Sequence, residues 1–205
     1  MFGSSPLAVT SILILNILVF MAWNLASVET TDFMARNFLI SWAGLLEGRF
    51  WTLITAAFSH NLFFHFFMNM FVLNGFGAAV ERTIGFSSFL KFYLFAAAFS
   101  SLSHAVVSTF LLGEPNLPAL GASGAISGLV FLFAVIYPRQ QIFIFGLIPV
   151  PAKWAVAAFV GLDLWGLIAQ TGGGGLPIGH GAHLGGVVAG ILYYFFILRK
   201  NFSRA

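Results

Sequence analysis

The sequence contains no cysteine and very little charge. Only 7% of its 205 residues are Asp, Glu, Lys or Arg, whereas soluble domains carry about a quarter. The absence of cysteine excludes disulfides, thiol catalysis and thiolate-ligated metal sites. The scarcity of charge, with 60% hydrophobic residues and a mean hydropathy of +0.97, excludes an ordinary soluble domain. We therefore predict a protein that crosses the membrane several times.

The small excess of charge is basic, with a net charge of +3 and a pI near 9.6. A basic protein can bind nucleic acid when its Lys and Arg residues gather into one patch or stripe. Here they lie singly or in a pair between apolar segments, a pattern that membrane topology explains better. We predict contact with membrane lipids and no nucleic-acid partner.

The apolar residues divide into segments of the length that a membrane span requires. A helix needs about 20 apolar residues to cross the hydrocarbon core, so a chain of this length has room for about six. The first segment lacks a basic leader and is too long for the core of a signal peptide, so we interpret it as a retained span. We predict an all-α membrane protein with a single domain over residues 1–205 and six spans, at about residues 7–26, 62–79, 86–112, 123–137, 153–169 and 182–198.

Three connections between these spans have an unusual composition. Residues 29–61 mix charged side chains with apolar patches that are too short to cross, so we expect this long loop to lie partly in the membrane. Residues 140–151 are apolar and include two prolines, which indicates an interfacial segment. Residues 171–181 are rich in glycine and lead into the last span.

The positions of the basic residues predict the orientation in the membrane. Cytoplasmic loops of membrane proteins carry an excess of Lys and Arg. With both termini in the cytoplasm, seven of the nine basic residues lie on that side, and only Arg36 and Arg49 lie outside. The seven are Arg82, Lys91, Arg139, Lys153, Arg199, Lys200 and Arg204. In this topology the second, fourth and sixth spans enter the membrane from the outer face.

Ser123 lies at the outer end of the fourth span, and His183 lies just inside the outer end of the sixth. A serine nucleophile needs a base within hydrogen-bond reach, and a neutral imidazole can accept its proton. No carboxylate lies near His183 in the sequence, and Asp163 is a span away. We therefore predict a Ser-His dyad rather than a triad, and a structural, hydrogen-bonded role for Asp163.

Two further polar residues, His65 and Asn69, lie early in the second span. They are four residues apart and so share one helical face. An imidazole and an amide that point together can donate hydrogen bonds to a developing oxyanion, helped by free backbone N–H groups at the start of the fourth span. Polar groups at membrane depth are costly and are a functional hypothesis by default.

The fourth and sixth spans each carry two glycines four residues apart, Gly124 with Gly128 and Gly186 with Gly190. This spacing of small residues lets two helix backbones approach closely. Contact between these two spans would bring the serine and the histidine together.

Several motifs in this chain occur together in one known family. They are His65-Phe-Phe-Met-Asn69, Gly77-Ala-Ala-Val-Glu81-Arg-Thr-Ile-Gly85, Gly121-Ala-Ser123-Gly124 and Gly181-Ala-His183-Leu-Gly185-Gly186. Over about residues 47–190 their order and spacing resemble the rhomboid intramembrane serine proteases. A lone Gly-x-Ser-Gly is not specific, but this combination is. The chain departs from the family where Trp51 is followed by Thr52 in place of the frequent arginine, and in the run of glycines from 172 to 175.

The resemblance implies a rhomboid-like bundle of six spans with a membrane-embedded first loop and a water-filled cavity open to the outer face. It implies Ser123 as nucleophile, His183 as general base, and His65 with Asn69 as oxyanion-stabilising side chains. The fifth span would be a lateral gate and residues 171–181 a flexible cap. The implied activity is a serine endopeptidase that cleaves single-span membrane proteins in or near their transmembrane segment, with no cofactor and no metal.

Other interpretations of the same residues stay open. Taken alone, a serine among glycines in a membrane helix is more often a packing residue than a nucleophile. His180 and His183 are three apart and could ligate a metal, but no His-Glu-x-x-His motif accompanies them. The main alternative function is a non-proteolytic rhomboid-like protein that binds membrane clients. A third is a haem or ion transporter that uses the five histidines.

The minimal length and the lack of appended domains favour a bacterial inner membrane, with an organelle membrane as the alternative. The sequence identifies neither the natural substrate nor the oligomeric state.

Overall fold

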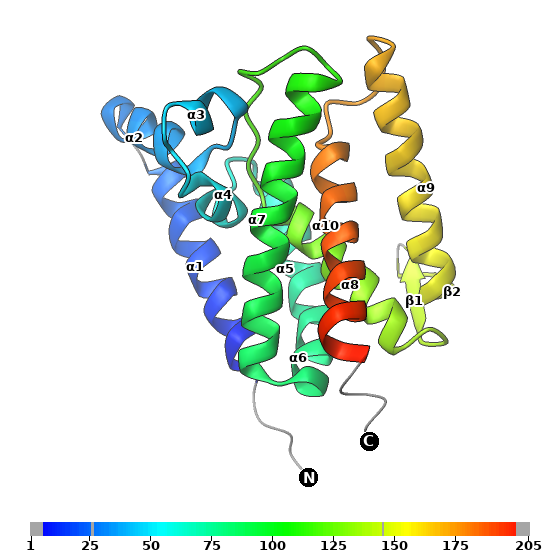
Figure 1. Ribbon diagram of the computed structural model, residues 1–205. Helices are drawn as coiled ribbons and strands as arrows, with labels where there is room; N and C mark the ends of the chain where they lie inside the picture. The colour runs from blue at the N-terminus through cyan, green and yellow to red at the C-terminus, as the bar shows by residue number, and fades with distance from the viewer. Residues whose placement is uncertain (1–5, 26, 145, 200–205) are drawn as a thin grey trace.

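Apolar helices that run up and down make up most of the structure, a computed structural model that describes residues 6–25, 27–144 and 146–199 (Figure 1). Among the described residues, five helical segments are long and apolar enough to cross a membrane. They are α1 (Leu7–Asn24), the continuous segment of α5 (Phe63–Val72), η2 (Leu73–Gly77) and α6 (Ala78–Ile84), α7 (Phe86–Phe110), α9 (Ala152–Thr171), and α10 (His180–Tyr193) with η3 (Tyr194–Leu198). The predicted all-α membrane fold is thus confirmed.

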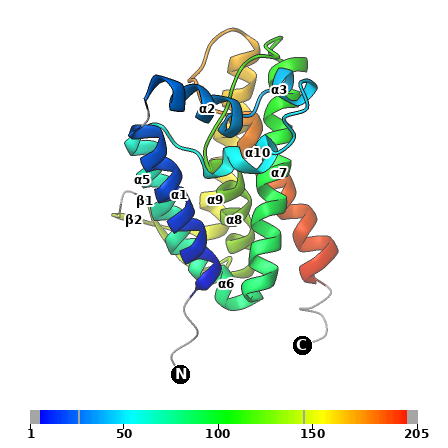
Figure 2. The same cartoon turned by 90° about the vertical axis from the view of Figure 1, so that its left-hand side faces the viewer.

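The remaining predicted span, α8 (Ser123–Ile136), is a shorter apolar helix. Its 14 residues make it about 21 Å long, less than the hydrocarbon core of about 30 Å. It begins partway down the bundle, below the upper ends of α7 and α9 (Figures 1 and 2). Nine of its 14 residues are buried, so the helix lies inside the protein, and its first residue, Ser123, is half-buried.

Successive long helices alternate in direction (Figure 1). α1, α7 and α9 run upward in that view, whereas α5 with α6, α8 and α10 run downward. The lower end contains the start of α1, the end of η3, α6 and the start of α9. α6 carries Arg82, and the start of α9 carries Lys153. α2 (Val28–Phe38), which carries Arg36, lies at the other end. This arrangement matches the predicted separation of basic residues, although Lys200 and Arg204, like Ala26 of the first predicted span, fall outside the described residues.

The loop after α1 contains short helices that the sequence analysis did not predict. They are α2, α3 (Trp42–Leu46), α4 (Thr52–Thr55) and the 3₁₀ turn η1 (Ala56–Phe58). Figure 2 shows α2 above α1 and α3 beside the upper part of α7. Ser27 and Ser41 cap α2 and α3 by accepting the Thr30 and Gly44 backbone N–H groups.

Arg49 anchors this loop through its backbone and side chain. Its guanidinium donates to the Arg36 carbonyl at 3.3 Å and pairs with Glu47 at 3.1 Å. The Thr52 hydroxyl in turn donates to the Arg49 carbonyl at 2.6 Å. The threonine that replaces the family's frequent arginine is therefore part of the same small network.

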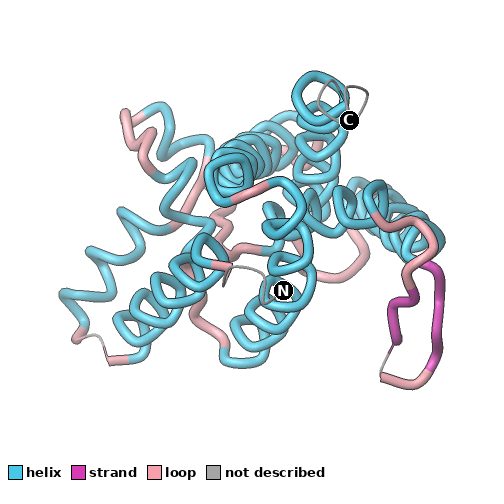
Figure 3. The backbone as a smooth tube through the Cα atoms, turned by 90° about the horizontal axis from the view of Figure 1, so that it is seen from below, coloured by secondary structure: helices cyan, strands magenta, loops and turns pink. Residues whose placement is uncertain are grey.

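Residues 140–151, which were predicted to be interfacial, form an antiparallel hairpin of β1 (Gln141–Ile144) and β2 (Ile148–Pro151). The register pairs Gln141 with Pro151 and Ile144 with Ile148. The hairpin projects from the edge of the bundle (Figure 3). Its strands were not predicted, because the apolar run has no alternation of polar and apolar residues.

The second predicted span continues beyond its expected end at residue 79, and α6 ends at Ile84. Glu81 was expected to stop the span, but it is buried in the bundle. Its two carboxylate oxygens accept the backbone N–H groups of Ala8 at 2.9 Å and Val9 at 2.8 Å. Since these are orphan donors in the first turn of α1, the carboxylate is satisfied by a neighbouring helix end and does not interrupt its own helix.

Glycines bring α8 and α10 into backbone contact, as their spacing predicted. A Cβ added at Gly128 would lie 2.5 Å from the Gly186 carbonyl oxygen, and one added at Gly190 would lie 2.8 Å from the Gly128 carbonyl oxygen. Gly124 packs with equally little room against Ser100 of α7. These contacts place the first turns of α8 and α10 side by side.

Candidate active site

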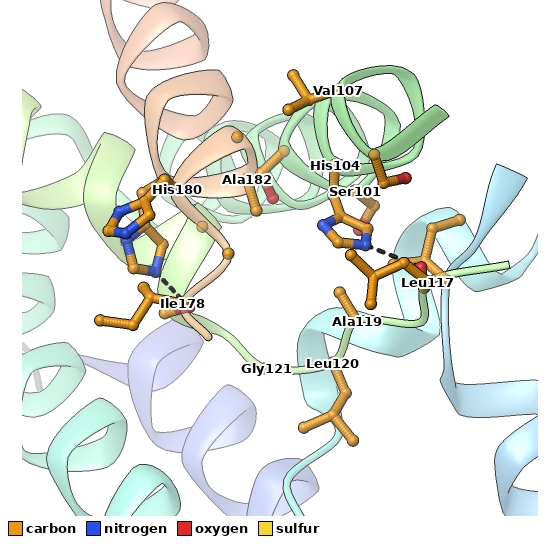
Figure 4. Close-up of a pocket in the computed structure, with 18 of the residues that line it drawn as sticks. Ser101, His104, Val107, Leu117, Ala119, Leu120, Gly121, Ile178, His180 and Ala182 are labelled. Atoms are coloured by element: carbon orange, nitrogen blue, oxygen red, sulfur yellow. Dashed lines mark hydrogen bonds between the residues drawn. The ribbon is translucent and has the colours of Figure 1, made fainter. Parts of the chain in front are cut away.

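A cavity of about 580 Å³ lies over the start of α8. Ser123, His183 and His65 line it together with residues of α7, of the loop before α8 and of the loop before α10. Figure 4 shows Ser101, His104 and Val107 of α7 on one side, with His180 and Ala182 of α10 across from them. The dashed line beside Leu117 joins His104 Nε2 to the Leu117 carbonyl, 3.1 Å apart, and this contact holds the loop against α7.

Ser123 and His183, the predicted nucleophile and base, face each other. Ser123 is the first residue of α8, and His183 lies in the first turn of α10, where its backbone N–H donates to the Gly179 carbonyl. His183 Nε2 is 3.0 Å from Ser123 Oγ. This is the distance of a hydrogen bond through which a proton can pass from a serine to a base.

Asp163 of α9 lies on the other side of His183. Its Oδ1 is 3.1 Å from His183 Nδ1 and 2.6 Å from Nδ1 of a second histidine, His180. The expectation that no carboxylate reaches His183 was therefore wrong, because the antiparallel packing of α9 and α10 brings together residues 20 positions apart. The expected hydrogen-bonded character of Asp163 is confirmed. Sequence spacing gave no signal for this contact except the presence of one acidic residue in an apolar span.

His65 and Asn69, the predicted oxyanion donors, take different positions. His65 lines the cavity, as Ser123 does, and its ring lies next to Gly121. Asn69 is buried, and its amide donates to the His65 carbonyl at 2.8 Å. Asn69 is not among the described residues that line the cavity. The structure therefore brings His65, and not Asn69, to the cavity surface. The role of both side chains stays a prediction.

The chain that leads to Ser123 is held by the first loop. Ile40 and Ala119 exchange two backbone hydrogen bonds of 2.9 Å, and Gly121 N–H donates to the Ala56 carbonyl at 2.9 Å. Gly121 has a φ of +119°, and a Cβ there would lie 2.6 Å from His65 Cε1. A side chain at this position would strain the backbone and displace the imidazole, which explains the glycine before the nucleophile.

His60 also supports the approach to Ser123. Its Nε2 accepts the Ala122 backbone N–H at 3.3 Å, and its ring is fully buried. Burial, with a smaller contribution from the neighbouring His65, lowers the pKa of His60 to about 3. The imidazole is therefore neutral at physiological pH and can act as an acceptor.

Asp163, His180 and His183 also form a set that could hold a metal ion. Their ligand atoms all lie within 4.8 Å of one another, and imidazole with carboxylate is a donor set that zinc accepts. Both imidazole Nδ1 atoms already contact Asp163 Oδ1, so the arrangement is also explained without an ion. The expectation of no metal and no cofactor stays a prediction.

The fold and this site define a helical membrane protein in which a serine and a histidine meet at the wall of a cavity. The Rhomboid domain matches residues 47–200, and the chain belongs to the rhomboid family.

Several curated relatives are similar along most of this chain. RHOMBOID-like protein 12, mitochondrial, of Arabidopsis thaliana is 32% identical over 95% of this chain and 59% of its own length. Rhomboid protein 1, mitochondrial, of Saccharomyces cerevisiae is 35% identical over 71% of this chain and 41% of its own. Presenilin-associated rhomboid-like protein, mitochondrial, of Homo sapiens is 32% identical over 90% and 47%. The chain thus spans about half the length of these relatives.

The names of the relatives correct one expectation. They are mitochondrial proteins, and a further relative from Arabidopsis thaliana is chloroplastic. The expected bacterial inner membrane is therefore not borne out. The expected integral membrane protein with several spans is confirmed. The expectation of a bacterial membrane came from the minimal length and the lack of appended domains, and neither feature identifies a membrane.

Proposed function

We propose that this protein is a serine endopeptidase that cleaves single-span membrane proteins in or near their transmembrane segment. The observation that carries the proposal is the 3.0 Å contact between Ser123 Oγ and His183 Nε2 at the wall of the cavity. Membership of a family made up largely of intramembrane serine proteases supports it.

The proposed chemistry begins with acylation of the serine. Ser123 Oγ attacks the carbonyl carbon of the scissile bond while its proton passes to His183 Nε2. The C–N bond then breaks, and the departing amine takes the proton from His183. Water completes the cycle by attacking the acyl-enzyme and giving its proton to His183, which returns it to the serine.

The negative charge that develops on the carbonyl oxygen needs donors in place before the reaction. His65 at the cavity wall and the free backbone N–H groups of the first turn of α8 are suited to this. Each such donor is worth about 2.7–4 kcal/mol in the transition state. Asn69, one helical turn after His65, donates to the His65 carbonyl in this structure, and its amide reaches the oxyanion only after turning toward the cavity.

The proposed substrates are transmembrane helices that unwind easily. A helix in lipid keeps its carbonyl groups in intrachain hydrogen bonds, so the scissile bond is exposed only where the helix opens. Helix-destabilising residues and a small residue before the cut are expected. We place the basic end of the bundle on the cytoplasmic side and the cavity toward the outer face.

The first prediction tests this function. Purified protein should cleave a generic single-span reporter in detergent, and Ser123→Ala and His183→Ala should each reduce the rate by at least about 10³-fold, because each removes a reacting group. A fluorophosphonate probe should label wild-type protein and not Ser123→Ala. Cleavage by Ser123→Ala at the wild-type rate would exclude the mechanism. Neither cleavage nor labelling of folded wild-type protein would favour the client-binding role.

A further inference from the structure

Asp163 is a buried carboxylate on a helix that otherwise faces outward. Of the 20 residues of α9, only Ala152, Val156, Asp163 and Gly166 are buried. Asp163 is 4% exposed. A carboxylate at this depth is costly unless specific partners compensate for the lost hydration. Its partners therefore indicate why it is there.

Both partners of Asp163 are histidines, and both use the same ring atom. His180 Nδ1 and His183 Nδ1 each contact Asp163 Oδ1, while Oδ2 is buried and has no partner among the described residues. A neutral imidazole that donates from Nδ1 has its lone pair on Nε2. In His183 that Nε2 is the atom 3.0 Å from Ser123 Oγ. The contact with Asp163 thus selects the tautomer that can accept the serine proton.

We propose that Asp163 is a positioning residue for the reaction proposed above, on which this inference rests. It fixes the ring of His183 with Nε2 toward Ser123, and its negative charge stabilises the imidazolium that forms when the serine gives up its proton. Ser123 and His183 remain the groups that touch the substrate. Asp163 acts through His183 alone.

His180 holds the carboxylate in place from the other side. Its ring is packed against α9 at Gly166, where an added Cβ would lie 2.8 Å from His180 Cδ2. Its contact with Asp163 is the shorter of the two, 2.6 Å against 3.1 Å. His180 therefore fixes the side chain of Asp163, and a glycine on α9 gives its ring the space to do so.

The test measures kcat and KM of reporter cleavage for wild type, Asp163→Asn, Asp163→Glu and His180→Asn. The rate of fluorophosphonate labelling is measured for the same four proteins. Asparagine keeps the size of the side chain and removes its charge. We expect Asp163→Asn to lower kcat by about 10²- to 10⁴-fold with KM within a few-fold, and to slow labelling in parallel. Asp163→Glu retains the charge and should keep at least tenfold more activity than the asparagine variant. His180→Asn should lose less than Asp163→Asn.

Gly161→Ala is the matched control on the same helix, since a Cβ there meets no atom within 4 Å. Thermal unfolding reports whether each variant is folded, and rates are compared per folded protein. If Asp163→Asn does not fold, kcat is compared between Asp163→Glu, which keeps the charge, and Asp163→Ser, which removes it. Equal kcat for charged and uncharged variants overturns the positioning role while wild-type cleavage still upholds the protease. An inactive, unlabelled wild type overturns the protease itself.

Discussion

At the scale of single residues, the nucleophile is positioned by side chains that do not react. His60 accepts the backbone N–H of Ala122, the residue directly before Ser123. Because this acceptor must be neutral, its pKa of about 3 in the folded protein, lowered mainly by burial, matters for stability. The unfolded chain, in which the imidazole has its ordinary value of 6.5, takes up a proton over a pH range where the folded protein does not.

We therefore predict that the protein loses stability as the pH falls from about 6.5 toward 3, and that His60 accounts for part of this loss. His60→Gln keeps a hydrogen-bonding side chain and removes the titration. Its melting temperature should be lower than that of wild type at neutral pH and should decline less steeply on acidification. Melting curves in detergent over a series of pH values measure this. Parallel declines in the two proteins would contradict the prediction.

At the scale of helices, the site depends on how closely α8 and α10 approach. The two helices contact through Gly124, Gly128, Gly186 and Gly190, so that even a methyl group lacks space. In lipid, such close packing replaces the hydrophobic drive that joins helices in water. The separation of Ser123 and His183 is set by this contact.

Gly186→Ala tests the contact. An added Cβ would overlap the Gly124 carbonyl group, so α10 must move away from α8. We expect a loss of stability of about 1–3 kcal/mol or more and a large fall in cleavage rate. The control, Gly161→Ala on α9, replaces a helical glycine in open space and should be neutral or stabilising by up to about 1 kcal/mol. Equal effects of the two substitutions would contradict the packing argument.

At the scale of the whole molecule, the two ends of the bundle differ in charge and in structure. The first loop and the loops around the cavity lie at one end, whereas the β1–β2 hairpin lies at the edge of the opposite half (Figure 1). The orientation rests on the basic residues of the lower end. Since the sequence contains no cysteine, an introduced one is its only thiol.

Single cysteines can therefore test the orientation. Asn116 and Gln140 are both exposed. The loop before α8, which contains Asn116, lies at the upper end of the bundle, and the segment after α8, which contains Gln140, lies in its lower half (Figure 1). With the protein expressed in the inner membrane of a bacterial host, we expect a membrane-impermeant maleimide to label Asn116→Cys in intact cells and Gln140→Cys only after permeabilisation. The cysteine-free protein is the control for unspecific labelling. The reverse pattern would show that the basic end faces outward.

Much of the architecture followed from composition and motif spacing. Uninterrupted apolar runs predicted the long helices because lipid cannot satisfy backbone groups outside a helix. Glycine spacing predicted the contact of α8 with α10. The short helices of the first loop, the hairpin and the end of α6 at Ile84 were missed, because caps and partners such as Glu81 with α1 are supplied by distant parts of the chain.

The candidate site was also predicted only in part. Ser123, His183 and His65 could be identified from the sequence, since motifs of local spacing carry them and each lies near a helix start. The contact of His183 with Asp163 depends on how α9 packs against α10, and that packing brings the carboxylate within 3.1 Å of the imidazole. Local residue order determines which groups a helix presents, whereas the packing of helices determines which of those groups meet.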